Sequence, residues 1–174
     1  LLLDYAGRPH DVTSKSTAID LVTEADLASE RLIVDAIRTR FPDHAVLAEE
    51  DAALTGGDVR DYLHAVALRD DRPLWIVDPL DGTVNYAHGY PVWAVSLALT
   101  RAGRVLLAVT YDPPRDELYW ALPGAGAWCN DRRLHVSTAP ALGRALVATG
   151  FAYRRATLPD NNLAEFSRIM PRVQ

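Results

Sequence analysis

The chain has 174 residues and a net charge of −5, and 49% of its residues are hydrophobic and 24% charged. This composition is that of an ordinary soluble globular protein, and the acidic balance argues against a nucleic-acid-binding surface, which needs a basic face. No apolar run approaches the roughly 20 residues of a membrane-spanning helix, and residues 1–10 lack the basic and long apolar regions of a signal peptide. The single cysteine, Cys129, excludes an internal disulfide bond and a cysteine-based zinc site. We therefore expect a cytoplasmic protein that binds neither nucleic acid nor membrane.

The clearest element near the N-terminus is a helix. The chain begins in what reads as the last turns of one helix, and the polar, turn-rich residues 9–20 predict a loop or a hairpin. A long helix is predicted over 23–41, because Thr23 and Asp26 form a capping-box start and Pro42 ends the periodic pattern. Its apolar stripe consists of Leu27, Val34, Ile37 and Phe41.

The rest of the chain is dominated by short apolar runs bounded by turn residues, which predict strands. The predicted elements are strands over 45–51, 74–78, 92–100, 104–112, 116–122, 126–136 and 144–150, a flap or short helix over 58–70, and the start of a helix over 163–170. Ala102-Gly103 and Asn130-Asp131 are the expected hairpin turns. A helix followed by mainly antiparallel strands indicates the α+β class, with helices packed on the sheet.

Carboxylates gather at the ends of two predicted strands. Glu49-Glu50-Asp51 follows one strand, Asp78 and Asp81 follow another, and Asp26 lies in the long helix. Carboxylates that converge repel one another unless a cation holds them. Mg²⁺ prefers oxygen ligands and usually binds through a few carboxylates and a substrate phosphate, and a pair of such ions can activate water in phosphate displacement. The pattern therefore favours a magnesium site if the strand ends lie side by side.

The segment Asp78-Pro79-Leu80-Asp81 suits such a site. Pro79 fixes φ and is expected to end strand pairing, so that the turn aims both carboxylates and the Leu80 carbonyl at one point. Gly82 removes a side chain where another group approaches the backbone. If Thr83 opens a helical turn, the amides of Gly82 and Thr83 could bind a phosphate.

Each of these features also has a plain structural explanation when it is taken singly. Asp81-Gly82 is a common turn and Asp78-Pro79 a common way to leave a strand. The acidic run 49–51 could be a solvated loop, and Asp26 and Thr83 could merely cap helices. Lys15 could be an ordinary loop charge.

The combination of these features resembles a known family. Residues 75–86, WIVDPLDGTVNY, resemble the metal-binding signature of the inositol monophosphatase family. Residues 20–30, 41–51, 90–99 and 124–137 resemble further family segments in the same order, so the resemblance covers nearly the whole chain. The resemblance implies a Mg²⁺-dependent, lithium-sensitive phosphatase fold of stacked α and β layers.

The resemblance also implies a set of metal ligands. Glu49, Asp78 and the Leu80 carbonyl would hold a first Mg²⁺, and Asp78 and Asp81 would share a second. The residues implied for an outer shell or a third ion are Glu50 and Lys15.

The remaining roles implied by the resemblance concern water and phosphate. Glu49 and Thr83 would orient or activate the attacking water, with Asp26 hydrogen-bonded to Thr83. The amides of Gly82 and Thr83 would bind the substrate phosphate. No Cys or Ser stands beside a base as a nucleophile, so we expect no covalent phospho-enzyme.

The sequence departs from the family pattern in two places. Asp51 stands where the family commonly has Ser or Thr, and the later W-D-x-A-A-G segment, whose Asp is a ligand of the second metal, is not found in the 174 residues. We therefore expect residues 1–174 to be the N-terminal, α+β metal-binding part of a longer phosphatase, incomplete at both ends.

The expected function is that of a Mg²⁺-dependent phosphomonoesterase, a homodimer that hydrolyses a small phosphorylated alcohol by metal-activated water. Inositol-1-phosphate is the first substrate that the resemblance suggests, and the alternatives are fructose-1,6-bisphosphate, histidinol phosphate and adenosine 3′,5′-bisphosphate. A function of another class also stays open, namely a non-catalytic metal-binding or regulatory protein with the same fold.

Overall fold

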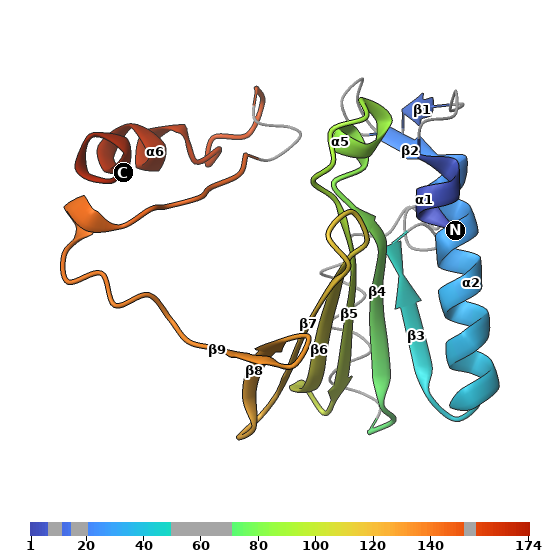
Figure 1. Ribbon diagram of the computed structural model, residues 1–174. Coiled ribbons are helices and arrows are strands. Elements are labelled where there is room, and N and C mark those ends of the chain that lie inside the picture. Colours follow the sequence, from blue (N-terminus) through green and yellow to red (C-terminus); the bar gives the residue numbers. More distant parts are fainter. Residues whose placement is uncertain (7–11, 15–20, 50–70, 152–155) are drawn as a thin grey trace.

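A seven-stranded sheet forms the centre of the computed structural model, which describes all residues except 7–11, 15–20, 50–70 and 152–155. Its strands lie in chain order (Figure 1), and they are β3 (Ala45–Ala48), β4 (Leu74–Asp81), β5 (Ala94–Arg101), β6 (Arg104–Asp112), β7 (Glu117–Leu122), β8 (Gly126–Cys129) and β9 (Arg132–Leu134). β3 and β4 are parallel, and every other neighbouring pair in this sheet is antiparallel. The predicted α+β class and mainly antiparallel sheet are confirmed.

The N-terminal part supplies a helix that packs on this sheet and a small hairpin. β1 (Val12–Ser14) pairs antiparallel with β2 (Leu21–Thr23), so the hairpin interpretation is correct for these residues. α1 (Leu2–Tyr5) precedes the hairpin, and α2 (Glu24–Arg40) follows it. The predicted capping box is present, because the Thr23 side chain accepts from the Asp26 N–H and the Asp26 carboxylate accepts from the Thr23 N–H.

α2 lies along the β3–β4 side of the sheet and forms a core with it (Figure 1). Val34 and Ile37 pack against Trp75 and the neighbouring strand residues. The predicted stripe is correct for these two residues and wrong for Leu27 and Phe41, which are each 37% exposed. Near its N-terminus the helix turns polar side chains toward the protein interior, and the buried ones are Asp26, Ser29 and Glu30. Polar side chains therefore take the inward positions in the first turns of α2, whereas Phe41 is its C-cap and lies beside the Trp75 ring at the other end.

The C-terminal segment leads away from β9 and ends in a short helix (Figure 1). It contains η1 (Leu142–Arg144), α6 (Leu163–Ile169) and η2 (Met170–Arg172), so the predicted helix start over 163–170 is confirmed. The strand predicted over 144–150 is wrong, because no strand of the described residues pairs with this segment and Leu146 is 87% exposed. The apolar run alone cannot form a strand, since a strand needs a neighbour for its hydrogen bonds.

Two further predictions concern the turn at Asn130-Asp131 and the segment 58–70. The turn at Asn130-Asp131 is confirmed, with Asn130 at φ 51° between β8 and β9. The flap or short helix predicted over 58–70 lies outside the described residues. Within the described residues, the helices are too short or too polar to span a bilayer.

Candidate functional site

The end of β4 is irregular at the segment that carries the acidic motif. Asp78 pairs with Ser96 and Asp81 pairs with Ala94, which leaves Pro79 and Leu80 in a bulge. The prediction that Pro79 ends strand pairing is wrong, because the ladder resumes at Asp81. A bulge residue does not need its N–H for the ladder, so a proline is accommodated there. The bulge places Asp78 and Asp81 at the same end of one strand.

Hydrogen bonds fix the backbone of this bulge from several sides. The Ser29 hydroxyl of α2 donates to the Pro79 carbonyl at 2.9 Å, in a buried position. The Leu80 N–H donates to Asp78 Oδ1 at 3.1 Å, and the Thr83 hydroxyl lies 3.0 Å from the Leu80 carbonyl. Because a carbonyl oxygen has two lone pairs, that of Leu80 can accept from Thr83 and still offer an oxygen to a cation.

Asp26 connects the start of α2 to the start of α5 (Thr83–Ala87). Its carboxylate is 1% exposed. Oδ2 accepts from the Thr23 N–H at 2.9 Å and from the Thr23 hydroxyl, and Oδ1 accepts from the Thr83 hydroxyl at 3.1 Å. These donors offset the cost of burying the carboxylate. The structure therefore places Asp26 in contact with Thr83, as the resemblance implied.

Asp78 is surrounded by other acidic groups. The pKa of this half-buried carboxyl is raised from 3.8 to about 7. Burial is the largest cause, followed by the negative charges of Glu49 and Asp81 and a hydrogen bond with Glu49, while the hydrogen bond from the Leu80 N–H acts in the opposite direction. Glu49 and Asp81 themselves are exposed. Two carboxylates, one from the neighbouring strand end and one from the same strand, thus act on Asp78, and a cation placed beside Asp78 would relieve the repulsion.

The chemistry of these donors fits a hard divalent cation. Carboxylates and a backbone carbonyl are the oxygen ligands that Mg²⁺ takes. The raised pKa of Asp78 reflects its burial and the nearby negative charges of Glu49 and Asp81, both of which a bound cation would offset. Among the described residues there is no group of three or more His, Cys, Asp or Glu side chains already arranged to hold a metal ion. The predicted residues Glu50 and Lys15 lie outside those residues.

Gly82 adopts a backbone conformation that other residues rarely take, with φ 94°. A Cβ at this position would lie 3.0 Å from the Val92 carbonyl oxygen and 3.2 Å from the Trp93 Cα. The expectation that another group approaches the Gly82 backbone is therefore correct, and the approaching group within the protein is the segment that precedes β5. Thr83 begins α5 and is 8% exposed.

Sequence reasoning missed two residues that shape this end of the sheet. Ser29 holds the Pro79 carbonyl, and the Asn85 amide donates to the Val92 carbonyl at 2.8 Å. Ser29 stands three residues after Asp26, so a polar pair on one helix face was the available signal. Asn85 lies inside the recognised motif, but its partner comes from a loop whose course the pattern does not predict.

The match to a protein-family model decides the family. The model of the inositol monophosphatase family matches residues 1–173. The chain belongs to the inositol monophosphatase family. Among its relatives are inositol-1-monophosphatase of Synechocystis sp., 44% identical over 92% of this chain and 52% of the relative, and Nus factor SuhB of Pseudomonas aeruginosa, 44% identical over 90% and 55%. The chain thus spans about half the length of these curated relatives.

Solved structures of the family have the same fold as this chain. The inositol monophosphatase of Anabaena (Nostoc) sp. matches with a TM-score of 0.73 and 43% identity, over 86% of this chain and 55% of that one. An IMPase/NADP phosphatase, solved with Mg²⁺ and phosphate, matches with a TM-score of 0.68 and 28% identity, over 83% and 51%. The predicted family and its α+β fold are therefore both confirmed.

Proposed function

We propose that the protein containing this chain is a Mg²⁺-dependent phosphomonoesterase that acts on a small phosphorylated alcohol. The observation that carries the proposal is the position of Asp78 beside Glu49 and Asp81, one bulge away from Thr83 and its partner Asp26. Family membership supports the proposal, and so do the Mg²⁺ and phosphate bound by the related IMPase/NADP phosphatase. Inositol-1-phosphate is the proposed substrate, and the relative from Synechocystis sp. supports that choice.

The proposed metal ligands are the oxygens of Glu49, Asp78, Asp81 and the Leu80 carbonyl. When bound, Mg²⁺ would supply Lewis-acid activation of water and stabilisation of the leaving oxygen. The bulge holds the Asp78 and Leu80 oxygens in a fixed relation, because the Leu80 N–H donates to Asp78 and Ser29 fixes the preceding carbonyl. Preorganised donors of this kind need little rearrangement during the reaction. Glu50 and Lys15 remain proposed for an outer shell or a third ion.

Thr83 is proposed to orient the attacking water together with Glu49. The Thr83 hydroxyl has one hydrogen, which can be donated to Asp26 Oδ1 at 3.1 Å or to the Leu80 carbonyl at 3.0 Å. In either case the lone pairs of Thr83 Oγ1 stay available to accept a hydrogen from water. Asp26 itself is buried and is proposed to hold the Thr83 hydroxyl in place rather than to touch the substrate.

The amides of Gly82 and Thr83 are proposed to bind the substrate phosphate. Gly82 has no side chain, and its backbone enters α5 with a positive φ. No Cβ therefore shields the Gly82 N–H. A phosphate held there would lie next to the oxygens of Asp81 and Thr83, because these residues are neighbours in the chain.

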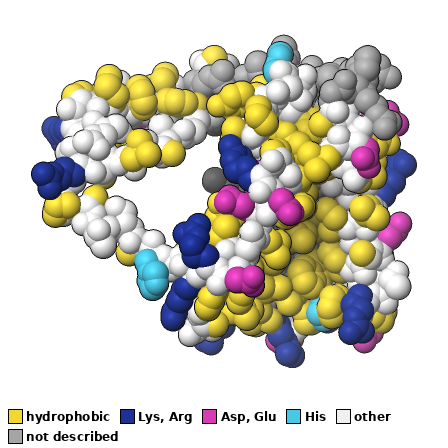
Figure 2. Space-filling model, viewed as in Figure 1, with side chains coloured by type: hydrophobic (Ala, Val, Ile, Leu, Met, Phe, Trp, Pro, Cys, Tyr) yellow, Lys and Arg dark blue, Asp and Glu magenta, His cyan; other side chains and the backbone are white. Residues whose placement is uncertain are grey.

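A second candidate function is a regulatory role with the same fold. The observation in its favour is the relative named Nus factor SuhB, which is as similar to this chain as the Synechocystis inositol-1-monophosphatase, at 44% identity. A partner-binding function would need a surface, and the sheet carries exposed apolar side chains (Figure 2), among them Val105, Leu106, Leu118 and Leu122. The same side chains support the proposed homodimer, and the cytoplasmic location stays a proposal from composition.

The test is phosphate release by the full natural protein from inositol-1-phosphate, fructose-1,6-bisphosphate, histidinol phosphate and adenosine 3′,5′-bisphosphate. Each reaction is run with Mg²⁺ and with EDTA. The proposal predicts release that needs Mg²⁺ and is fastest with one small phosphorylated alcohol. Absence of release from every substrate, with Mg²⁺ still bound, would favour the regulatory function.

A further inference from the structure

The segment from Tyr90 to Trp93 determines where Asp81 and Gly82 lie. Asp81 pairs with Ala94, the first residue of β5. The Val92 carbonyl oxygen occupies the space beside Gly82, 3.0 Å from where a Cβ would stand. A shift of this segment would therefore move the end of β4 or open a gap beside Gly82. The placement of Asp81 and Gly82 depends on whatever holds residues 90–93.

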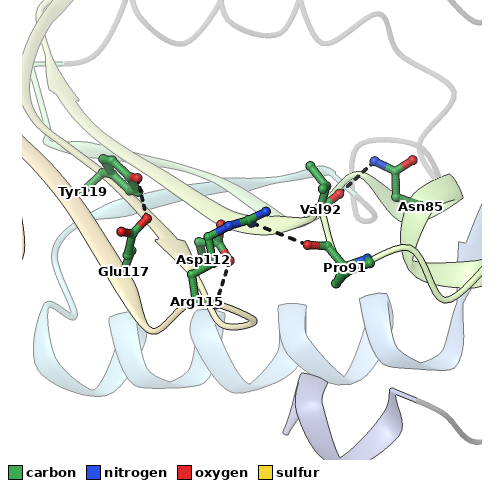
Figure 3. Close-up of polar contacts among 7 residues, drawn as sticks. All are labelled: Asn85, Pro91, Val92, Asp112, Arg115, Glu117 and Tyr119. Atoms are coloured by element: carbon green, nitrogen blue, oxygen red, sulfur yellow. Dashed lines mark hydrogen bonds and ion pairs between the residues drawn. The ribbon is translucent and has the colours of Figure 1, made fainter.

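Asn85 holds this segment at both ends. Its side-chain amide donates to the Val92 carbonyl at 2.8 Å (Figure 3). Its main-chain carbonyl accepts from the Tyr90 N–H at 2.8 Å. The Val92 N–H in turn donates to the Tyr90 carbonyl at 2.8 Å, which makes a tight turn of these three residues. One residue of α5 thus fixes both ends of the turn that packs beside Gly82.

Arg115 holds the same segment from the opposite side (Figure 3). Its guanidinium lies 2.6 Å from an Asp112 carboxylate oxygen and 3.5 Å from the Pro91 carbonyl. The Arg115 N–H also donates to Asp112, at 3.1 Å, so the arginine is anchored to the turn between β6 and β7. The hydrogen bond with Asp112 and the charge of that carboxylate, with a smaller effect of nearby Glu117, favour the protonated guanidinium and raise its pKa. Although its side chain is about half exposed, the arginine is thus held by Asp112 with a donor directed at the Pro91 carbonyl.

We propose that Asn85 and Arg115 are positioning residues for the phosphate-binding end of β4. They act through the 90–93 segment, which sets the position of Asp81 and of the Gly82 N–H, and neither residue touches the phosphate. The inference rests on the proposed function of Gly82 and Asp81. We expect substitution of Asn85 to affect phosphate binding more than substitution of Arg115, because the Asn85 hydrogen bond is short and its acceptor is the Val92 carbonyl that faces Gly82.

The experiment compares neutral variants with conservative ones in the full natural protein. Asn85→Leu keeps the approximate size and removes the donor without adding charge, and Asn85→Gln keeps an amide donor. Arg115→Met removes the second donor, Arg115→Lys keeps a cation, and Arg104→Ala removes an exposed arginine at the far end of β6 as the control. For each variant we would measure kcat and KM for the best substrate, the Kd of inorganic phosphate with Mg²⁺ present, and Tm.

A positioning role predicts that Asn85→Leu raises the Kd of phosphate and lowers kcat/KM by about 10- to 100-fold in protein that remains folded. Arg115→Met should change the phosphate Kd and kcat/KM in the same direction by a smaller factor. The conservative variants Asn85→Gln and Arg115→Lys should lie between the neutral variants and the wild type. The control Arg104→Ala should match the wild type. A merely structural role would lower Tm and leave phosphate affinity unchanged.

Two results would overturn the inference, and they are distinguishable. Unchanged phosphate affinity in folded Asn85→Leu and Arg115→Met, beside an active wild type, would overturn this inference alone. A wild type that neither binds phosphate nor hydrolyses any ester would overturn the proposed function and the inference with it. If Asn85→Leu does not fold, Arg115→Met gives the answer, because the Arg115 side chain is exposed.

Discussion

The two ends of β4 are built differently, although they belong to one strand. At the C-terminal end, buried polar groups are joined by hydrogen bonds, among them Asp26 with Thr83 and Ser29 with Pro79. At the N-terminal end, the Trp75 indole stands beside aromatic rings and donates to His44 Nδ1 at 3.0 Å. A hydrogen-bonded network with acidic groups can bind and orient polar ligands, whereas packed aromatic rings contribute to the stability of the fold. The aromatic contacts thus stabilise β4 at its N-terminal end, and the polar groups at its C-terminal end are those proposed for function.

The largest effect on activity is expected from Thr83→Val at the polar end. Valine keeps the shape but leaves Asp26 Oδ1 and the Leu80 carbonyl without the Thr83 donor. We expect a loss of phosphate release of about 100-fold or more, the range of a positioned proton-transfer group. Thr100→Val is the matched control, because the Thr100 hydroxyl donates to Leu74 at the opposite end of β4. Equal losses in the two variants would contradict the proposed division.

Gly82→Ala tests the close approach of the 90–93 segment. The added Cβ would meet the Val92 carbonyl at 3.0 Å and would also strain the positive φ, so we expect a loss of about 2–3 kcal/mol in the free energy of unfolding. Gly103→Ala has a positive φ but no atom within 4 Å, and it should cost only about 1 kcal/mol. Denaturant unfolding measures both, and equal costs would show that the contact beside Gly82 has no effect on stability.

The raised pKa of Asp78 predicts a pH dependence of metal binding. The folded carboxyl has a pKa of about 7, against 3.8 as the ordinary value of an aspartate, so it must lose a proton before it can bind Mg²⁺. Affinity for Mg²⁺ should therefore rise about tenfold between pH 6 and pH 8. Without metal, the folded state holds the proton more tightly than the unfolded state, so stability should fall as pH rises from about 4 to 7. Calorimetric titrations at pH 6 and pH 8 measure the change in affinity, and thermal melts of the metal-free protein between pH 4 and pH 7 measure the change in stability. A flat profile in either measurement would contradict the corresponding prediction.

The smallest effect is expected at the aromatic end. His44→Ala removes the acceptor of the Trp75 indole and should lower the free energy of unfolding by about 1–2 kcal/mol. Phosphate release and its KM should stay at wild-type values, because the change lies at the other end of β4. A drop in kcat without a drop in stability would show that the two ends are not separate.

Local signals made much of the fold predictable. The capping box of Thr23 and Asp26 marks the start of α2, and Ala102-Gly103 marks the β5–β6 hairpin, because the residues that determine these features are neighbours in sequence. The strand predicted from the apolar run at 144–150 was wrong, because strand formation depends on a partner strand that is distant in sequence. The 17-residue α2 was predicted within one residue at each end, and its buried face was predicted correctly at Val34 and Ile37. The first turns were not, because the polar side chains of Asp26, Ser29 and Glu30 are the buried ones there.

The candidate site was predictable only as a set of residue types. The acidic strand ends predicted that Glu49 would lie near Asp78 and Asp81 if the two strands were neighbours, and the family resemblance implied the contact of Asp26 with Thr83. In the structure Glu49 and Asp81 both act on Asp78, and the Thr83 hydroxyl lies 3.1 Å from Asp26 Oδ1. The sequence did not predict that pairing resumes after Pro79 or that the Val92 carbonyl covers Gly82. Both features arise from contacts with β5 and the segment before it, which no local pattern encodes.

The measurement that tests the central claim most directly is a Mg²⁺ titration of the full natural protein at pH 8, with Asp78→Asn beside it. Asp131→Asn, in the exposed turn between β8 and β9, is the control for loss of one negative charge. The account predicts Mg²⁺ binding by the wild type and by Asp131→Asn, and its loss in Asp78→Asn that is still folded. Undiminished binding by Asp78→Asn would contradict the assignment of the metal site to the end of β4.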